Sequence, residues 1–287
     1  MKLVTFTHQA TTRLGIISGD QVVDLAAASP KLPRDMNAFL GAGAEAMSTA
    51  RAAETNARAR LPLADVRLEA PVMRPPKFLA IGLNYADHVA ESGMEKPPVP
   101  VFFNKQSTCV VGPYDPIHLP RVSSLLDYEG ELAFVIGRRC RHVPAERAHE
   151  VIAGYTIVND VSVRDWQLRT PTMTMGKSFD THGPMGPWLV TPDEVGDPHA
   201  LELRTLVDGE VRQHSNTRQL IYDCFAQVEH LSTAFTLEPG DVVTTGTPSG
   251  VGGAMRPPRF LTAGSVVRVE IEKLGYIENK VIDEPAQ

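Results

Sequence analysis

The stretch Asp127-Tyr128-Glu129-Gly130-Glu131-Leu132-Ala133-Phe134-Val135-Ile136-Gly137 determines how the rest of this chain is interpreted. In a strand the side chains alternate between two faces, so Glu129 and Glu131 point the same way, and apolar residues follow on both faces. A strand that is apolar on both faces is normally interior. Two carboxylates at one end of it, about 7 Å apart by strand rise, would repel each other and resist desolvation. The stretch therefore predicts a buried strand whose acidic end needs a compensating positive charge.

A divalent cation would supply that charge, because hard oxygen ligands suit Mg²⁺, Mn²⁺ or Ca²⁺. The alternative is that the strand end lies in water, or that arginines pair with the glutamates. A third carboxylate, Asp160, directly follows the strand-like run over residues 155–159. Three carboxylates from two core strands fit an octahedral site whose other positions hold water or substrate. Asp160 could instead cap a helix over residues 161–167, and both roles stay open at this point.

The composition bounds the kind of protein and the kind of partner. The chain has 287 residues, of which 43% are hydrophobic and 22% charged, as in soluble globular proteins. A net charge of −6 argues against nucleic acid or an anionic membrane as the main partner. Three widely spaced cysteines contain no CxxC pair, so neither a zinc knuckle nor a disulfide framework is indicated. Without a signal-peptide pattern or a long apolar run, the predicted location is cytoplasmic.

The order of the predicted elements indicates a small leading domain and a larger second one. Short strands over residues 2–25 include a hairpin, and an Ala-rich helical stretch follows over 35–60. Residues 62–76 contain several prolines, which is typical of a linker. Later segments are mostly strand-like, with helices expected near 144–153 and 219–235. The predicted fold class is α+β, mostly β, with domains over 1–70 and 71–287.

Three further segments place polar side chains where function is plausible on chemical grounds. A short helix near residues 83–92 is bounded by Gly93 and prolines, so it has little local support and could move as a lid. His88 and Glu91 are neighbours on that helix, although an exposed, solvated pair is the simpler interpretation. Lys177 lies in a loop rich in Gly and Pro, where a surface amine is the ordinary expectation. The loop over 245–253 matches neither the Walker nor the G-x-S-x-G pattern, but its amides and Thr247 can approach a ligand closely.

In order and spacing, these segments resemble the fumarylacetoacetate hydrolase family across about residues 77–283. The matching segments are Gly82-Leu83-Asn84-Tyr85 with His88 and Glu91, Asp127 to Leu132, Gly154-Tyr155, Asn159-Asp160-Val161-Ser162 with Arg164, Gly176-Lys177-Ser178-Phe179-Asp180 with Gly186-Pro187, and Thr245-Gly246-Thr247-Pro248 with Gly250-Val251-Gly252. The resemblance implies a mixed β-roll catalytic domain behind a small N-terminal α/β domain. It also implies a homodimer that binds one Mg²⁺ or Mn²⁺ per subunit.

The resemblance assigns roles to individual residues. The implied metal ligands are Glu129, Glu131 and Asp160. The residues implied to bind the carboxylate and oxo groups of a 2-oxo acid are Arg164, Gln167, Lys177 and Thr247. The implied catalytic residues are His88 and Glu91, which match a pair on a mobile lid that activates water in acylpyruvate-cleaving members, together with Lys177.

The implied activity is a metal-dependent hydrolase that cleaves a carbon–carbon bond in an acylpyruvate or another β-diketo acid, as in aromatic catabolism. In this reaction the 2-oxo acid chelates the metal, and water attacks the distal carbonyl. The alternative is an oxaloacetate-type decarboxylase or a 5-carboxymethyl-2-hydroxymuconate-type isomerase with the same site. A non-catalytic binder of oxo acids is disfavoured, because binding alone needs no base.

Overall fold

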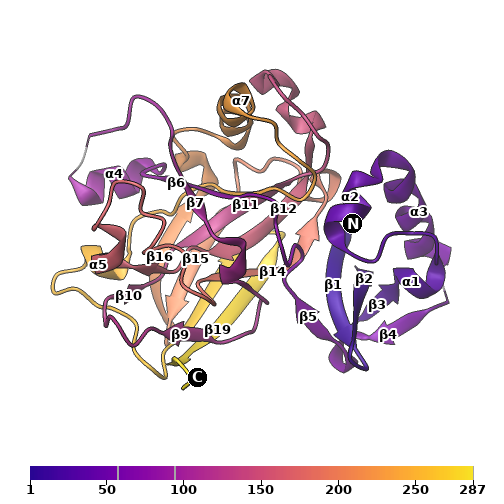
Figure 1. Ribbon diagram of the computed structural model, residues 1–287, viewed down its shortest axis with the longest axis horizontal. Helices are drawn as coiled ribbons and strands as arrows, with labels where there is room; N and C mark the ends of the chain where they lie inside the picture. Colours follow the sequence, from indigo (N-terminus) through magenta and orange to yellow (C-terminus); the bar gives the residue numbers. More distant parts are fainter. Residues whose placement is uncertain (57, 94, 287) are drawn as a thin grey trace.

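The computed structural model describes residues 1–286 except 57 and 94, and it has an α+β architecture in which strands predominate, as the sequence predicts (Figure 1). At its centre lies β11 (Gly130–Ile136), in which all seven residues are buried. This strand pairs antiparallel with β12 (Ile152–Asn159) on one side and with β17 (Val242–Thr244) on the other. Its apolar side chains thus face protein on both sides, which explains the non-alternating sequence of the run.

In the described part of the chain, the sheet built around β11 has twelve strands. In spatial order its main path is β4 (Arg60–Pro62), β3 (Gln21–Asp24), β2 (Thr11–Ser18), β1 (Lys2–His8), β14 (Gly183–Val190), β12, β11, β17, β6 (Phe78–Gly82) and β7 (Val101–Lys105). Two short strands lie off this path, β5 (Arg67–Glu69) beside β1 and β8 (Val110–Val111) beside β14. The strands before residue 70 therefore continue the sheet of the later segment through the β1–β14 pair. The division of the chain at residue 70 remains a prediction.

A second, five-stranded sheet packs on β11 and β12. Its strands, in spatial order, are β16 (Glu210–Asn216), β15 (Glu202–Val207), β18 (Val266–Ile271), β19 (Gly275–Asp283) and β9 (Ile117–Leu119). The core between the two sheets includes Leu132 and Phe134 from β11 and Leu203 and Val269 from the second sheet. A small two-stranded sheet, β10 (Leu126–Asp127) with β13 (Ser162–Val163), lies at the end of β11 that carries the acidic residues.

The helices lie at the edges of this framework (Figure 1). They are α1 (Leu25–Ala28), α2 (Met36–Gly41), α3 (Gly43–Asn56), α4 (Ala86–Ser92), α5 (Arg164–Gln167), α6 (Pro192–Val195) and α7 (Cys224–Ala234). Short 3₁₀ turns cover Leu63–Asp65, Ser107–Cys109, Ala145–Glu150, Thr217–Gln219 and Gly252–Ala254. Among the described residues, no helix combines the length and the apolarity that crossing a membrane requires.

Several predicted boundaries need correction. The stretch over 62–76 is more than a linker, because β5 pairs with β1 and buries Leu68. The helix expected near 144–153 is only a 3₁₀ turn, since β12 already begins at Ile152. The expected helix over 161–167 is shorter, because residues 162–163 form β13 before α5. The last predicted helix starts only at Cys224, after the N-cap Asp223.

Candidate active site

The pairing of β11 with β12 brings the three predicted carboxylates together. Gly130 is paired with Asn159, so Glu129 and Asp160 lie side by side just beyond the ends of the two strands. The amide of Asp160 donates to the carbonyl of Glu129 at 2.8 Å. One carboxylate oxygen from each of Glu129, Glu131 and Asp160 lies within 4.8 Å of the other two, and all three residues are buried. The alternative role of Asp160 as a helix cap is wrong, because Val163 occupies the N-cap position of α5 and no side chain caps that helix.

Two basic side chains, Lys177 and Arg164, form ion pairs with Glu129, and Lys177 also pairs with Asp160. The Lys177 ammonium lies 2.7 Å from Glu129 Oε2 and 2.9 Å from Asp160 Oδ2. Arg164 Nη1 lies 2.6 Å from Glu129 Oε1. Burial alone would raise the pKa of Glu129, but Lys177 and Arg164 outweigh it and lower that pKa to about 2. Lys177 is thus a buried part of the site, which overturns the simple expectation of a surface amine.

Glu131 has the opposite electrostatic environment. Burial, followed by repulsion from Asp160 and Glu129, raises the pKa of Glu131 well above its usual value. Its Oε2 accepts one hydrogen bond, from the amide of Gly246 at 2.8 Å. The three carboxyl groups together offer hard oxygen ligands at short separation. A further positive charge beside Glu131 would favour its ionised form. This donor set fits a divalent cation such as Mg²⁺ or Mn²⁺.

Two charged residues that support the site were not assigned from the sequence. The Lys105 side chain is fully buried at the end of β7, and its Nζ lies 2.7 Å from Asp160 Oδ1. It also donates to the backbone carbonyls of Lys177 and, at 3.0 Å, of His182. This ammonium therefore combines an ion pair to Asp160 with two hydrogen bonds to backbone carbonyls. The one sequence signal was a lysine directly after an apolar strand, and nothing in that pattern names Asp160 as its partner.

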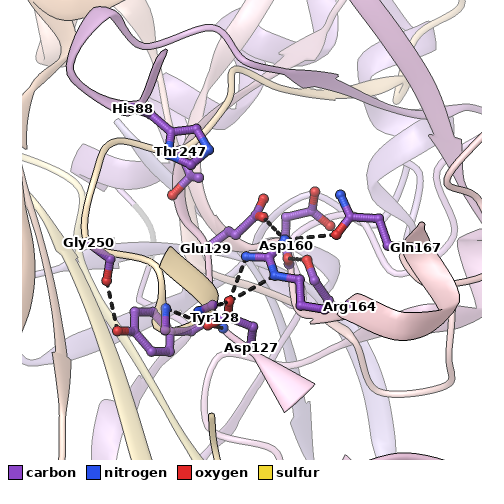
Figure 2. Close-up of polar contacts among 12 residues, drawn as sticks. His88, Asp127, Tyr128, Glu129, Asp160, Arg164, Gln167, Thr247 and Gly250 are labelled. Atoms are coloured by element: carbon purple, nitrogen blue, oxygen red, sulfur yellow. Dashed lines mark hydrogen bonds and ion pairs between the residues drawn. The ribbon is translucent and has the colours of Figure 1, made fainter. Parts of the chain in front are cut away.

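Asp127 is the second of these residues and pairs with Arg164 (Figure 2). Its carboxylate accepts from Arg164 Nε at 2.8 Å, and from the amides of Gly252 and Gly253 at 2.8 and 2.9 Å. It therefore orients the guanidinium toward Glu129 and ties it to the loop after β17. In the sequence Asp127 lies two residues before Glu129, but nothing in the pattern indicates that Asp127 is buried and not at a solvated strand end.

The predicted lid helix α4 rests on this same loop. His88 Nδ1 lies 3.3 Å from Glu91 Oε2, and the Gly250 amide donates to Glu91 Oε1 at 2.9 Å. The Ser215 hydroxyl, on β16, donates to Asp87 Oδ2 at 2.6 Å. The two side chains of the His88–Glu91 pair are only 16% and 25% exposed. The pair is thus docked on the loop, in contrast to the solvated pair that the simpler interpretation expected.

The two remaining predicted residues also lie in this cluster (Figure 2). Gln167 Oε1 accepts from Arg164 Nη1 at 2.9 Å, so α5 presents both side chains together. The Thr247 hydroxyl donates to the carbonyl of Gly130 at 3.0 Å, between the two acidic residues of the motif. The structure therefore gathers all the residues named from the resemblance around one acidic cluster. Their individual roles remain proposals.

Two family models match the chain. The fumarylacetoacetate (FAA) hydrolase C-terminal family matches residues 77–282, and the Rv2993c-like N-terminal family matches residues 1–71. The chain belongs to the fumarylacetoacetate hydrolase family. This confirms the resemblance on which the residue assignments are based.

Among curated relatives, mitochondrial oxaloacetate tautomerases are similar over nearly the whole chain. The protein from Xenopus laevis is 43% identical over 98% of this chain and 90% of its own length. A human counterpart is also 43% identical, over 98% of this chain and 92% of its own length. Family membership and these relatives make the chain an enzyme of the fumarylacetoacetate hydrolase superfamily, in which hydrolase, isomerase and tautomerase activities occur.

Solved structures of similar proteins cover the same range of chemistry. A 5-carboxymethyl-2-hydroxymuconate delta-isomerase from Mycobacterium smegmatis has a TM-score of 0.81 at 38% identity, covering 99% of this chain and 100% of the other. A maleylpyruvate hydrolase from Sphingobium sp., in complex with manganese(II) and pyruvate, has a TM-score of 0.83 at 33% identity, with the same coverage.

Proposed function

We propose that the protein is a divalent-metal-dependent enzyme that interconverts or cleaves small 2-oxo acids through their enol forms, with tautomerisation of an oxaloacetate-type diacid as the first reaction to test. The observation that carries the proposal is the docking of the His88–Glu91 pair on the loop that also contacts the buried carboxylate cluster. Glu129, Glu131 and Asp160 would hold Mg²⁺ or Mn²⁺. When bound, that cation would stabilise negative charge on the oxygen at C2 of the substrate.

The cationic residues bind and orient the acid in this proposal. Lys177 and Arg164 are held at the cluster by Glu129, and their charge attracts the substrate carboxylate. Gln167 and Asp127 keep the Arg164 guanidinium in place. The net charge of −6 makes such local cations necessary for an anionic substrate.

The lid residues move the proton. Glu91 binds Nδ1 of His88, which leaves Nε2 as the atom that exchanges a proton with the substrate. In tautomerisation the enol oxygen loses one proton and C3 gains one, so the pair moves a proton and no fragment is released. The similarity to oxaloacetate tautomerases over nearly the whole chain supports this order of candidates.

Hydrolysis of an acylpyruvate, the activity expected from the sequence, is the second candidate. The same His88–Glu91 pair could take a proton from water, and a similar protein of known structure is a maleylpyruvate hydrolase. Water would add to the distal carbonyl, and the carbon–carbon bond would break with its electron pair going to C3. Protonation of C3 then gives pyruvate, and the other product is a carboxylic acid.

A side-by-side product assay tests the proposal and separates the two candidates. Metal-loaded protein is given the enol form of oxaloacetate and, separately, an acylpyruvate, while tautomer conversion and acid plus pyruvate are measured. The control is Glu131→Gln at the same metal concentration, because free metal also promotes enolisation. The proposal predicts metal-dependent turnover of at least one substrate above this control. Equal rates for wild type and control on both substrates would contradict it.

Two expectations concern the assembled protein in its cell. The homodimer implied by the resemblance is a proposal that light scattering of the purified protein tests, with a mass near that of one chain as the contrary result. The cytoplasmic location is likewise a prediction, and the curated relatives named above are mitochondrial.

A further inference from the structure

Gln213, from the second sheet, hydrogen-bonds to Gly130, between the two glutamates of the motif. It lies on β16, is 1% exposed, and directs its side-chain amide at the peptide between the two acidic residues of the motif. Its Oε1 accepts from the Gly130 amide at 3.0 Å. Its Nε2 donates to Thr247 Oγ1 at 2.8 Å and to the Pro248 carbonyl at 2.9 Å. If the side-chain amide were reversed, Nε2 would face the Gly130 N–H, with two donors opposed, and Oε1 would face the Pro248 carbonyl, with two acceptors opposed. The hydrogen bonds therefore determine the orientation of the amide.

The position of Gln213 follows from where β17 ends. The pairing of β17 with β11 extends only to Ala133 and Thr244, so Gly130 lies beyond it. A buried backbone amide and carbonyl need partners, and here side chains replace the missing strand. Gln213 accepts from the Gly130 amide, and the Thr247 hydroxyl donates to the Gly130 carbonyl at 3.0 Å.

In this arrangement the Thr247 hydroxyl donates its one proton to a backbone carbonyl. A hydroxyl has one donor and two acceptor positions. The proton points to the Gly130 carbonyl, and one acceptor position receives Nε2–H of Gln213. The single position left can only accept a hydrogen bond.

We propose that Gln213 is a positioning residue that holds the Thr247 hydroxyl as a hydrogen-bond acceptor toward the ligand, so that this hydroxyl binds an O–H group and not a carboxylate. The proposal rests on the proposed function, because it takes the ligand to be a 2-oxo acid or its enol. It revises the role that the resemblance implied for Thr247. Keto and carboxylate oxygens are only acceptors, whereas an enol hydroxyl and a water molecule are donors. Thr247 would therefore favour the enol over the keto form, and the carboxylate would be left to Lys177 and Arg164.

Pyruvate and lactate are the matched probes for this proposal. Both carry a carboxylate and an oxygen at C2, but only lactate has an O–H there. Calorimetric titration of the Mn²⁺-loaded protein gives the affinity of each acid for wild type and for Thr247→Val. If the O–H belongs to the ligand, the lactate affinity falls about tenfold, the loss of one hydrogen bond, and the pyruvate affinity stays within about twofold. Thr247→Ser, which keeps a hydroxyl, restores the lactate affinity.

The other outcomes are equally distinct. If the O–H belongs to a water, both affinities stay unchanged while kcat falls in Thr247→Val. A tenfold fall in pyruvate affinity, or no change in either affinity or in kcat, overturns the proposal. If wild type binds neither acid with Mn²⁺ present, the proposed function fails, which is a different result from failure of the Thr247 assignment.

Gln213→Met tests the positioning role. Gln213→Met removes one of the two hydrogen bonds that orient the Thr247 hydroxyl. The lactate-to-pyruvate affinity ratio, or kcat in the case of water, should therefore change in the same direction as in Thr247→Val. In the double variant the two effects are less than additive, because both act through one hydroxyl. The matched control is Gln227→Met on α7, a fully buried glutamine whose Nε2 donates to the Tyr222 carbonyl. Additive effects, or an equal change in the control, contradict the proposal.

Discussion

The acidic cluster and the lid serve one site but are built in opposite ways. Glu129, Glu131 and Asp160 are at most 7% exposed and are placed by the register of two central strands. The lid α4 has seven residues, ends at Gly93 with a left-handed φ of 66°, and is held through hydrogen bonds to Gly250 and Ser215. The difference indicates that the cluster is preorganised before a ligand binds, whereas the proposed catalytic pair depends on the docking of α4.

The largest expected effect separates chemistry from binding. His88→Ala removes the proposed proton-transfer group but leaves the carboxylates in place, so kcat should fall about 10²- to 10⁴-fold with unchanged Mn²⁺ affinity. Steady-state kinetics and a metal titration measure the two quantities. His214→Ala, an exposed histidine paired with Glu202, is the control and should change neither. Full turnover in His88→Ala would show that the lid pair is not catalytic.

Removal of the buried ammonium behind the cluster should test how rigidly the cluster is held. Lys105→Met leaves Asp160 Oδ1 buried without its cation, while Oδ2 keeps Lys177. This should lower the free energy of unfolding by about 3–5 kcal/mol in a urea titration. The control Lys77→Met breaks a pair with buried Asp241, whose carboxylate also accepts from two backbone amides. Its loss of stability should be smaller. Equal losses of stability in the two variants would mean that Asp160 depends on Lys105 no more than Asp241 depends on Lys77.

Glu131→Gln should move stability and metal binding in opposite directions. Because the folded protein raises the pKa of Glu131, the unfolded chain releases this proton at a lower pH than the folded protein, so the metal-free fold loses stability as pH rises above the unfolded value near 4.5. The variant should therefore be more stable than wild type at pH 7 without metal, and the gain should disappear near pH 4. The Mn²⁺ affinity should fall more than about 100-fold, beyond the loss typical of residues that only support ligands.

Thermal unfolding with and without Mn²⁺, at both pH values, measures these effects. Saturating Mn²⁺ should reverse the order of stability of the two proteins, because only wild type gains from binding. A variant that is less stable at pH 7 without metal, or that still binds Mn²⁺ normally, would contradict the assigned role of Glu131.

The smallest expected effect concerns the docking of the lid. Ser215→Ala removes the hydrogen bond to Asp87, worth about 1 kcal/mol, so kcat/KM should fall by about fivefold. Global stability should hardly change, because α4 contributes little to the core. Ser123→Ala, which breaks the similar bond to Asp165 outside the lid, is the matched control and should leave kcat/KM within about twofold. Equal effects would mean that the Ser215 bond is not specific to the lid.

The strand-borne part of the site could be predicted from the sequence, because it depends on local pattern. The apolar run after Glu131 and the second run before Asp160 identify two interior strands, and their acidic ends name the candidate ligands. The family resemblance added the lid pair and Lys177, which local pattern alone treated as solvated.

The rest depends on tertiary contacts that no local pattern contains. Lys105 contacts Asp160 because β7 lies beside the loop that contains Lys177. Gln213 contacts Gly130 because the pairing of β17 with β11 ends at Ala133. The sequence predicted a linker over 62–76 and missed β5. The three residues of β5 form a strand because they pair with β1, and not because of their own strand propensity. The 3₁₀ turn near residue 145 was extended to a helix because nothing in the sequence indicated that β12 begins at Ile152.

The central claim is that Glu129, Glu131 and Asp160 hold one divalent cation that in turn positions a 2-oxo acid. The most direct test is a crystal structure of the protein with Mn²⁺ and oxalate, with anomalous diffraction locating the metal. The account predicts one strong anomalous peak about 2.1 Å from an oxygen of each carboxylate, with oxalate on its open side facing Arg164 and the lid. A peak elsewhere, or none at these three side chains in saturating Mn²⁺, would contradict it.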